Sequence, residues 1–268
     1  SKKIKNVIEI NKCKNMKKVF FVGAGPGDPE LITRAGWNAL TKADIILYDA
    51  LLDFDGFYKS APHSKWINVG KRANKISIKQ NFIGKILINY CRKGFSVVRL
   101  KGGDPSIFGR ISEEISVLKK MNILYEVIPG VTAASSAAAN LGISLSKRNE
   151  SRSIAFVTPA TSKSSSKDNH WLDTIFHSDT SIIYMGGGDR KKIAKTLISN
   201  GMNPLCPIAI VENAGYKKGY KKVMTLNQLA LDQFIPLNGP VCLIIGKILL
   251  DSDFCKEDLS INFDYFLI

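Results

Sequence analysis

The sequence predicts two α/β domains with mainly parallel sheets. Short apolar runs rich in β-branched residues alternate with longer stretches of helical periodicity, the pattern of strand–helix–strand units. The alternation gives roughly nine or ten strands, more than one small open sheet usually holds. The 268 residues, 45% of them hydrophobic, are enough for two packed cores. We therefore expect an N-terminal extension (1–16), an N-terminal domain (17–130), a C-terminal domain (131–250) and a tail (251–268).

The first domain is expected to begin with a buried strand at Val19–Val22. Asp28-Pro29-Glu30 supplies an N-cap, a first-turn proline and an acidic first turn, which predicts one helix to about Lys42. Ser77 and Gln80 form a capping box, which predicts a second helix ending near Gly94. The remaining elements predicted in this domain are strands at Ile45–Tyr48, Trp66–Val69, Val97–Leu100 and Leu124–Ile128, and a helix at Glu113–Met121.

The second domain shows the same alternation. Its first helix is predicted at Thr132–Leu141, where Gly142 ends it. The Ser- and Lys-rich stretch 162–169 is typical of a surface loop within the domain. The other predicted elements are strands at Ile154–Val157, Ser181–Met185, Ile208–Val211 and Val241–Ile245, and helices near Asp189–Ser199 and Leu226–Phe234.

The charge and the cysteine content limit which classes of protein this chain can belong to. The 38 basic and 23 acidic side chains give a net charge of +15, which favours a polyanionic partner, although a lysine-rich composition alone produces the same excess. No stretch supplies the ~20 apolar residues of a membrane-spanning helix, so no membrane partner is expected. The five cysteines form no C-x-x-C pair and no His lies at zinc-ligand spacing, which predicts reduced thiols, a cytoplasmic location and no metal site. Residues 1–15 are an extension, the remnant of a targeting segment or a cloning addition.

Candidate chemistry lies at the ends of predicted strands, where open α/β sheets bind ligands. The loop Gly23–Asp28 allows close backbone approach, but its glycines depart from the G-x-G-x-x-G dinucleotide pattern. Asp49 ends a strand and is either a general base or a local cap. Lys71 follows another strand and is either a proton donor or a solvated side chain. The turn Gly102–Pro105 offers a tight backbone platform for a ligand.

Seven motifs, in order along the chain, resemble those of the tetrapyrrole methylases. They are GAGPGDP at 23–29, Tyr48-Asp49, VGKR at 69–72, VVRLKGGDPSIFGR at 97–110, PGVTA at 129–133, Tyr184-Met185-Gly186 and Val211-Glu212-Asn213. The likeness runs from about Lys17 to Lys247 and is strongest to the members that methylate uroporphyrinogen III, which also form one half of bifunctional sirohaem synthases. It implies two α/β domains of the tetrapyrrole methylase type, with S-adenosylmethionine in the interdomain cleft and a homodimeric assembly.

The resemblance also implies an activity and its residues. Two methyl groups would pass from S-adenosylmethionine to pyrrole carbons of uroporphyrinogen III, giving precorrin-2 for sirohaem or cobalamin synthesis, with no metal. The proton acceptor falls on Asp49 and the proton donor on Lys71. The cofactor contacts fall on Pro26, Gly102, Gly103, Asp104, Ile107, Thr132, Ala133, Met185 and Ala214. Because the substrate carries many carboxylates, basic side chains would hold it, and the candidates are Arg72, Lys101, Arg110 and Arg148.

Alternative functions stay open at this point. The family pattern is broken at Ala50, Ile111, Ser112, Lys147 and Asn149, mostly on the presumed substrate side, so a methylase of a later precorrin intermediate is the main alternative. A nucleic-acid-binding protein fits the charge, but the basic residues are scattered and show no binding motif, so no nucleic-acid partner is expected. The third alternative is a chain that binds the cofactor but has lost catalytic activity, and the presence of both Asp49 and Lys71 argues against it.

Overall fold

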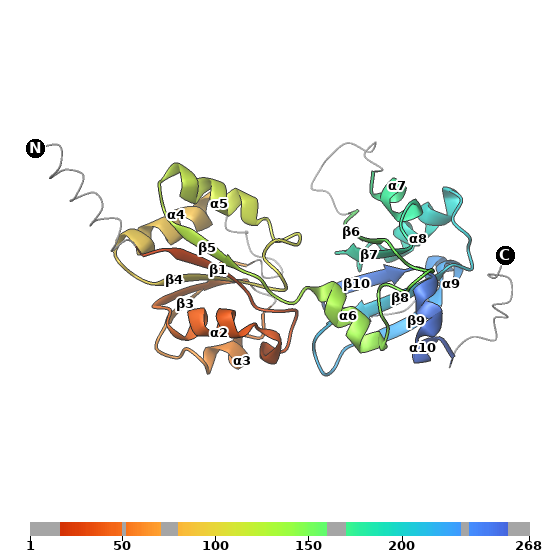
Figure 1. Cartoon of the computed structure of the whole chain (residues 1–268), viewed down its shortest axis with the longest axis horizontal. Helices are drawn as coiled ribbons and strands as arrows, with labels where there is room; N and C mark the ends of the chain where they lie inside the picture. The colour runs from red at the N-terminus through yellow and green to blue at the C-terminus, as the bar shows by residue number, and fades with distance from the viewer. Residues whose placement is uncertain (1–16, 50–51, 71–79, 160–169, 232–235, 257–268) are drawn as a thin grey trace, which may run out of the picture. The chain divides into compact units, whose positions relative to one another are not determined.

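A computed structural model of the chain describes residues 17–49, 52–70, 80–159, 170–231 and 236–256. The chain divides after Thr132 into two compact units, each with its own five-stranded sheet and covering helices (Figure 1). The expected pair of α/β domains is therefore confirmed. Within the described residues, no helix is long and apolar enough to cross a membrane. The expected extension at 1–16, the helix cap at Ser77 and the loop at 162–169 lie outside the described residues.

The first unit is built on a fully parallel sheet with the strand order β3-β2-β4-β1-β5. Its central strands β1 and β4 are almost completely buried, as the apolar sequence of β1 predicts, and in β4 the burial extends to Arg99 and Lys101. In a parallel sheet all carboxyl ends lie at one edge, so the loops that follow these strands converge there. The strands are β1 (Val19–Gly23), β2 (Ile45–Tyr48), β3 (Lys65–Asn68), β4 (Val97–Lys101) and β5 (Tyr125–Ile128).

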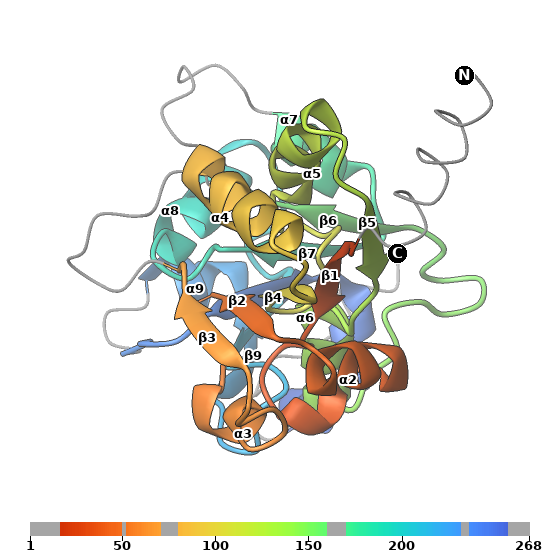
Figure 2. The ribbon, with the colours of Figure 1, turned by 90° about the vertical axis from the view of Figure 1, so that its left-hand side faces the viewer.

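Helices cover both faces of this sheet (Figures 1 and 2). The helices α4 (Gln80–Arg92) and α5 (Ile111–Lys120) pack on one face against a core that includes Phe21 and Leu47. The helices α2 (Arg34–Thr41) and α3 (Phe54–Tyr58) pack on the other, against a core that includes Leu100. Because side chains alternate along a strand, Val97 of β4 belongs to the α4–α5 face and Leu100 to the opposite one.

The single helix expected from Asp28 to Lys42 is wrong. A short 3-10 helix, η1 (Pro29–Leu31), is followed by extended backbone, and α2 begins afterwards. The Asp28 carboxylate accepts the Glu30 N–H at 3.0 Å and caps η1. Thr33 provides a second cap, because its Oγ1 accepts the Gly36 N–H at 3.1 Å. Two N-caps within six residues therefore divide the segment.

The second unit contains a mixed sheet with the order β6-β7-β10-β8-β9. Only β6 and β7 pair in parallel, whereas the other three pairings are antiparallel, so the expectation of mainly parallel sheets is corrected for this unit. The strand β9 was not expected, because its sequence opens with two lysines. It follows β8 closely enough to return beside it in the antiparallel direction. The strands are β6 (Ile154–Val157), β7 (Thr180–Tyr184), β8 (Pro207–Glu212), β9 (Lys221–Thr225) and β10 (Val241–Ile245).

The helices of the second unit enclose a separate apolar core. The central strands β8 and β10 are buried along their whole length. Their side chains meet those of α7, α8 and α9, for instance Leu243 with Leu197 and Leu229 in one cluster. The helices are α6 (Ala133–Leu141), α7 (His170–Phe176), α8 (Arg190–Ser199), α9 (Leu226–Leu231) and α10 (Asp253–Lys256), with a 3-10 helix η2 (Lys247–Asp251).

Candidate active site

Glycines bring three loops together at the carboxyl edge of the first sheet. The loops after β1 and β4 are joined by two backbone hydrogen bonds: Gly25 N–H donates to the Gly103 oxygen at 3.2 Å, and Gly103 N–H donates to the Gly25 oxygen at 2.7 Å. The loop after β5 is equally close, since a Cβ on Gly23 would lie 2.6 Å from the Cα of Gly130. Side chains at these positions would force the backbones apart, so glycine is required for the approach itself.

Asp104 fastens these loops with its carboxylate. Its Oδ1 accepts the Ser106 N–H at 2.7 Å, and its Oδ2 accepts the Gly130 N–H at 2.9 Å. Both oxygens thus serve the backbone of the loops after β4 and β5. Beside it, Gly102 is exposed, and the nearest atom to the position of its missing Cβ belongs to Leu52, 3.9 Å away. The edge therefore combines a rigid backbone with open space above Gly102.

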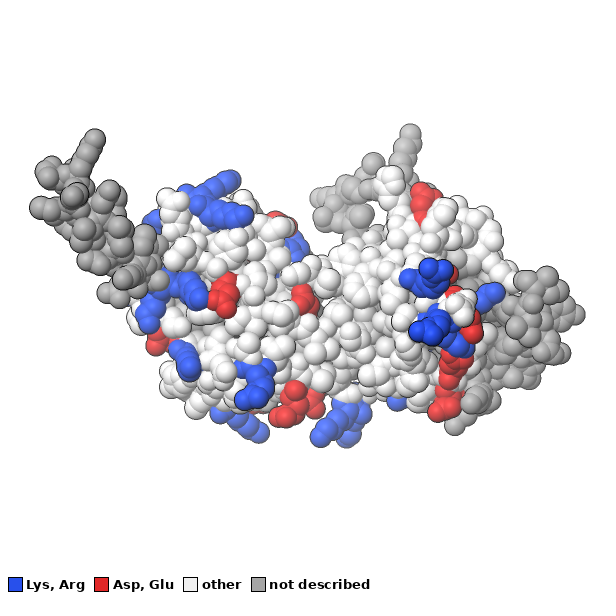
Figure 3. All heavy atoms as spheres, in the orientation of Figure 1, with Lys and Arg blue, Asp and Glu red and all other residues white. Residues whose placement is uncertain are grey.

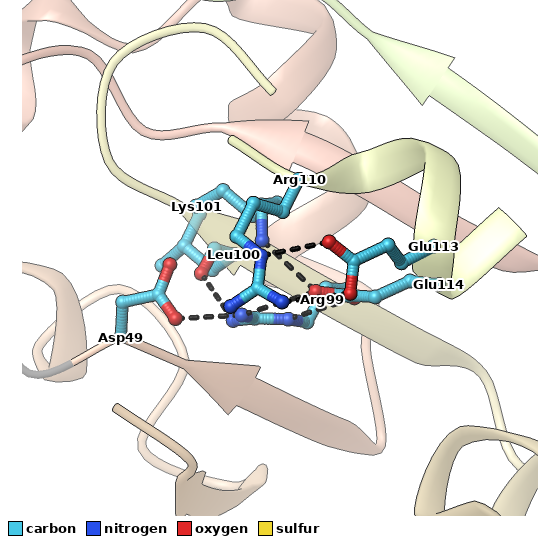
Figure 4. Close-up of polar contacts among 7 residues, drawn as sticks. All are labelled: Asp49, Arg99, Leu100, Lys101, Arg110, Glu113 and Glu114. Atoms are coloured by element: carbon cyan, nitrogen blue, oxygen red, sulfur yellow. Dashed lines mark hydrogen bonds and ion pairs between the residues drawn. The ribbon is translucent and has the colours of Figure 1, made fainter. Parts of the chain in front are cut away.

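A cluster of four charged residues lies beneath this edge, on the α4–α5 face (Figure 4). We call Asp49, Arg99, Lys101 and Glu114 the Arg99 cluster. Arg99 Nη2 contacts Asp49 Oδ1 at 2.6 Å, and Arg99 Nε contacts Glu114 Oε2 at 3.1 Å. Lys101 Nζ contacts the other Glu114 oxygen at 3.0 Å. Arg99 Nη1 donates to the Leu100 oxygen at 3.2 Å. The cluster therefore balances two carboxylates with two cations.

Burial in the Arg99 cluster is very uneven. The side chains of Arg99 and Glu114 are 1% and 0% exposed, whereas that of Asp49 is 31% exposed. Burial alone would lower the pKa of Arg99, but the charges and hydrogen bonds of Asp49 and Glu114 outweigh it and raise that pKa. Burial lowers the pKa of Lys101, and the positive charge of Arg99 lowers it further against the opposing effect of Glu114. Arg99 is therefore held as a buried cation, and Asp49 connects the cluster to solvent.

The expected proton donor, Lys71, and the expected substrate-binding cations differ in where they lie. Lys71 and Arg72 lie outside the described residues. Arg110 is exposed at the start of α5 and forms two 2.8 Å hydrogen bonds with Glu113. Arg148 is exposed. Lys101 differs most from the expectation of a cation facing the substrate, because its ammonium is buried against Glu114.

The cofactor candidates of the first unit gather at the glycine edge. Pro26 follows Gly25 directly, and Ile107 N–H donates to the backbone carbonyl oxygen of Asp104 at 3.2 Å. Thr132 closes the short segment that begins at Gly130. The structure thus places Pro26 and Ile107 beside Gly103 and Asp104, and Thr132 two residues after Gly130, which is bonded to Asp104.

The cofactor candidates of the second unit border on α6. Ala133 is the first residue of this helix, and the N–H of its neighbour Ala134 donates to Tyr184 Oη at 3.2 Å. Met185, directly after Tyr184, has a left-handed backbone (φ 57°) and is 56% exposed. Ala214 is buried, and the next residue is joined to α6 by a 3.2 Å bond from its N–H to Asn140 Oδ1.

Sequence reasoning missed Arg99 and Glu114. The available signal was alternation: Val97, Arg99 and Lys101 share one face of β4, so two cations continue a buried apolar row. The parallel register places Leu47 beside Arg99, and Asp49 continues the same face of β2. Buried cations require a carboxylate, which indicates an acidic partner on the covering helix. Only the fold identifies that partner as Glu114 rather than its neighbour Glu113.

Comparison with known proteins agrees with this architecture. The family model described as tetrapyrrole (corrin/porphyrin) methylases matches residues 18–230. The chain belongs to the tetrapyrrole methylase family. Among its relatives in the family, it is 40% identical over 239 residues to the uroporphyrinogen-III C-methyltransferase of Cyanidium caldarium, covering 88% of this chain and 95% of the relative.

Solved structures of tetrapyrrole methylases extend the likeness to the fold. The uroporphyrin-III C-methyl transferase of Thermus thermophilus, complexed with S-adenyl homocysteine, aligns with a TM-score of 0.73 at 33% identity, covering 87% of this chain and 93% of the other. A cobalt precorrin-4 methyltransferase aligns with a TM-score of 0.74 at 26% identity, covering 88% and 97%. The two TM-scores differ by only 0.01, so the fold alone does not distinguish the methyl acceptors.

Proposed function

We propose that this chain transfers methyl groups from S-adenosylmethionine to two pyrrole carbons of uroporphyrinogen III, forming precorrin-2. The observation that carries the proposal is that one sheet edge joins a glycine backbone cradle to the partly exposed carboxylate of Asp49. The 40% identity to a uroporphyrinogen-III C-methyltransferase supports this choice of acceptor. The proposal includes the domain limits 17–130 and 131–250, a homodimer, and a cytoplasmic or organellar location without a nucleic-acid partner.

The cradle fits a donor that carries no phosphate. Phosphate-binding loops typically aim successive N–H groups and cations at the ligand, whereas here Gly25 and Gly103 use their N–H groups on each other. Main-chain atoms around the exposed Gly102 remain to hold an adenosyl or amino-acid group. We assign the cofactor contacts of the first unit to Pro26, Gly102, Gly103, Asp104, Ile107 and Thr132, and those of the second unit to Ala133, Met185 and Ala214.

The chain's own task is alignment and proton removal. Bound S-adenosylmethionine supplies an electrophilic methyl group, whose bond pair stays on sulfur as the methyl leaves. A pyrrole carbon forms the new C–C bond with its own electron pair, so the macrocycle must then lose a proton. We assign its acceptance to Asp49, because Oδ1 is held by Arg99 and Oδ2 has no hydrogen-bond partner among the described residues. Lys71 is the proposed proton donor.

Cationic side chains would hold the carboxylates of the macrocycle. The exposed Arg110 and Arg148 are suited to this task, and Arg72 completes the proposed set. We assign Lys101 a different role, as the buried counter-ion of Glu114. These assignments separate the cations that meet the substrate from those that stabilise the site.

A methylase of a later precorrin intermediate is the second candidate. The solved cobalt precorrin-4 methyltransferase matches this chain with a TM-score of 0.74, which is as high as the value for the uroporphyrin-III enzyme. Its sequence identity is lower, 26% against 33%. The identities therefore favour uroporphyrinogen III as the acceptor.

The direct test is product identification. Purified protein is incubated with S-adenosylmethionine and enzymatically generated uroporphyrinogen III, and the tetrapyrrole is analysed by mass spectrometry and absorbance. We expect a product with two added methyl groups. Absence of methylation, together with methylation of a later precorrin offered in parallel, would establish the second candidate instead.

A further inference from the structure

Arg99 is the largest of the fully buried side chains among the described residues. It is 1% exposed, and all three of its guanidinium nitrogens are engaged. Nε binds Glu114, Nη1 binds the Leu100 oxygen, and Nη2 binds Asp49. Removing a guanidinium from water is costly, and a well-packed apolar residue at such a site is often at least as stable. A purely structural role therefore does not by itself explain an arginine in the middle of β4.

The arrangement reaches from the protein interior to the open sheet edge. Glu114 on α5 and the backbone of Leu100 hold two sides of the planar guanidinium, as Figure 4 shows. The third side is presented to Asp49, whose side chain is 31% exposed. Lys101 binds the second oxygen of Glu114 and so keeps that carboxylate in place. Arg99 alone of the three buried side chains contacts the partly exposed Asp49, and Glu114, itself held by Lys101, holds Arg99.

Among the described residues, Asp49 has one side-chain contact that can orient it. Its Oδ1 accepts from Arg99 at 2.6 Å, and no other side-chain contact to Asp49 is present within the described residues. The backbone at the end of β2 holds one end of the Asp49 side chain and Arg99 holds Oδ1 at the other, so together they set where Oδ2 lies. Loss of this anchor would leave the carboxylate free to rotate at the end of β2.

We infer that Arg99 is a positioning residue that fixes the Asp49 carboxylate, with Oδ1 held and Oδ2 free to accept the proton released by the methylated macrocycle. The inference rests on the proposed function. When Oδ2 takes the proton, Oδ1 still accepts from Arg99, so the anchor persists through the step. The proton then passes to solvent from the exposed side of Asp49. Glu114 acts on Asp49 indirectly, by orienting Arg99.

The test is a double-mutant cycle on Arg99 and Asp49. Arg99→Lys retains the positive charge but loses the planar fork that engages three partners. In the wild-type background we expect kcat to fall by about 10- to 100-fold, while the Kd for S-adenosylhomocysteine changes by less than about twofold. In an Asp49→Ala background, the same substitution should change the residual kcat by less than about threefold. Equal losses of kcat in both backgrounds would overturn the inference.

Two further variants separate positioning from general damage. Leu118→Ala removes a fully buried side chain from the same helix as Glu114, so it should lower the melting temperature and leave kcat unchanged well below that temperature. Glu114→Gln keeps the side-chain volume and weakens the hold on Arg99 together with the ion pair to Lys101. It should therefore lower kcat in the wild-type background alone, and it replaces Arg99→Lys in the cycle if the latter does not fold.

A readout without substrate keeps this inference distinct from the proposed function. Crystal structures of the wild type and of Arg99→Lys, each with S-adenosylhomocysteine, should show the Asp49 carboxylate displaced or in several conformers only in the variant. An unmoved Asp49 would overturn the inference whichever tetrapyrrole is the substrate. A wild-type protein that methylates no uroporphyrinogen III would instead refute the proposed function, and the crystallographic comparison would still decide the role of Arg99.

Discussion

At the scale of single residues, the structure separates three aspartates that follow similar apolar or turn segments. Asp28 and Asp53 accept backbone N–H groups and cap short helices. The Asp49 side chain makes no such cap within the described part of the chain and binds Arg99 instead. The sequence left a cap and a general base as alternatives for Asp49. Its ion pair with a buried cation favours the chemical role.

The substitution Asp49→Asn tests that role with almost no change in shape. The amide oxygen can still accept from Arg99, so we expect little change in the free energy of unfolding. The Kd for S-adenosylhomocysteine should stay within about threefold of wild type. An amide cannot accept the proton, so kcat should fall by about 10²- to 10⁴-fold. Calorimetric binding and steady-state turnover measure the two effects. Full turnover in this variant would exclude Asp49 as the acceptor.

At the scale of elements, the site depends on how closely three loops approach one another. The loops after β1, β4 and β5 meet at Gly23, Gly103 and Gly130 without any intervening side chain. The Asp104 carboxylate bridges the last two loops. These contacts hold the backbone of the proposed donor site rigid before any ligand binds.

Gly130→Ala should disrupt this meeting of loops. The new Cβ would lie 2.8 Å from the Cα of Gly23 and would collide with the Gly103 oxygen, so backbone must move. We expect a loss of about 1–3 kcal/mol in the free energy of unfolding, together with weaker binding of S-adenosylhomocysteine. Urea unfolding and calorimetry measure both.

Gly188→Ala is the matched control for this substitution. No atom lies within 4 Å of its Cβ position, and its backbone is not left-handed, so the change should be neutral or slightly stabilising. Similar losses of stability in the two variants would contradict the crowding at Gly130.

The central strand β10 of the second unit makes a separate, pH-dependent contribution. Cys242 is 5% exposed, and burial raises the pKa of its thiol from 9.0 to about 12. Between these values the native state keeps a proton that the unfolded state loses, so stability falls as pH rises above 9. The slope contributed by this thiol is at most about 1.4 kcal/mol per pH unit. Urea unfolding at pH 8 and pH 10 should show a smaller decline for Cys242→Ala than for wild type, and equal declines would refute the assignment.

At the scale of the whole molecule, basic side chains exceed acidic ones, and on one face of the described residues the two kinds are interspersed. The 38 basic and 23 acidic side chains give +15. On the face shown in Figure 3, Lys and Arg form separate groups with Asp and Glu among them. Such a distribution suits general attraction of a polycarboxylate better than a continuous nucleic-acid track.

This attraction should appear in the salt dependence of the reaction. For a polycarboxylate substrate, raising the salt concentration from about 0.05 to 0.5 M should lower kcat/KM by at least about threefold, because screening weakens steering by surface charges. The Kd for S-adenosylhomocysteine, which has no net charge to steer, should change by less than about twofold. Parallel kinetics and calorimetry at each salt concentration test this. A kcat/KM that is independent of salt would show that the excess charge has no part in substrate capture.

The local sequence was enough to predict much of the architecture. Runs such as Val97–Leu100 and Val241–Ile245 predicted the buried strands to within a residue or two, because their β-branched side chains fit a sheet covered on both faces. Once the strands were predicted, the residues at their ends, such as Asp49 and the Gly102–Pro105 turn, could be identified from the sequence as well. The loop Gly23–Pro29 and the motifs after it were enough to indicate the family.

No local sequence pattern predicted which distant segments pair. The antiparallel partners of β10, the extra strand β9, and the meeting of Arg99 with both Asp49 and Glu114 depend on residues brought together from separate parts of the chain. Asp49 and Arg99 are 50 positions apart, and Glu114 lies on a helix whose rotation selects it over Glu113. A buried cation needs a carboxylate, but which one it meets is decided by strand register and helix packing, because only these set the distances over which charges interact.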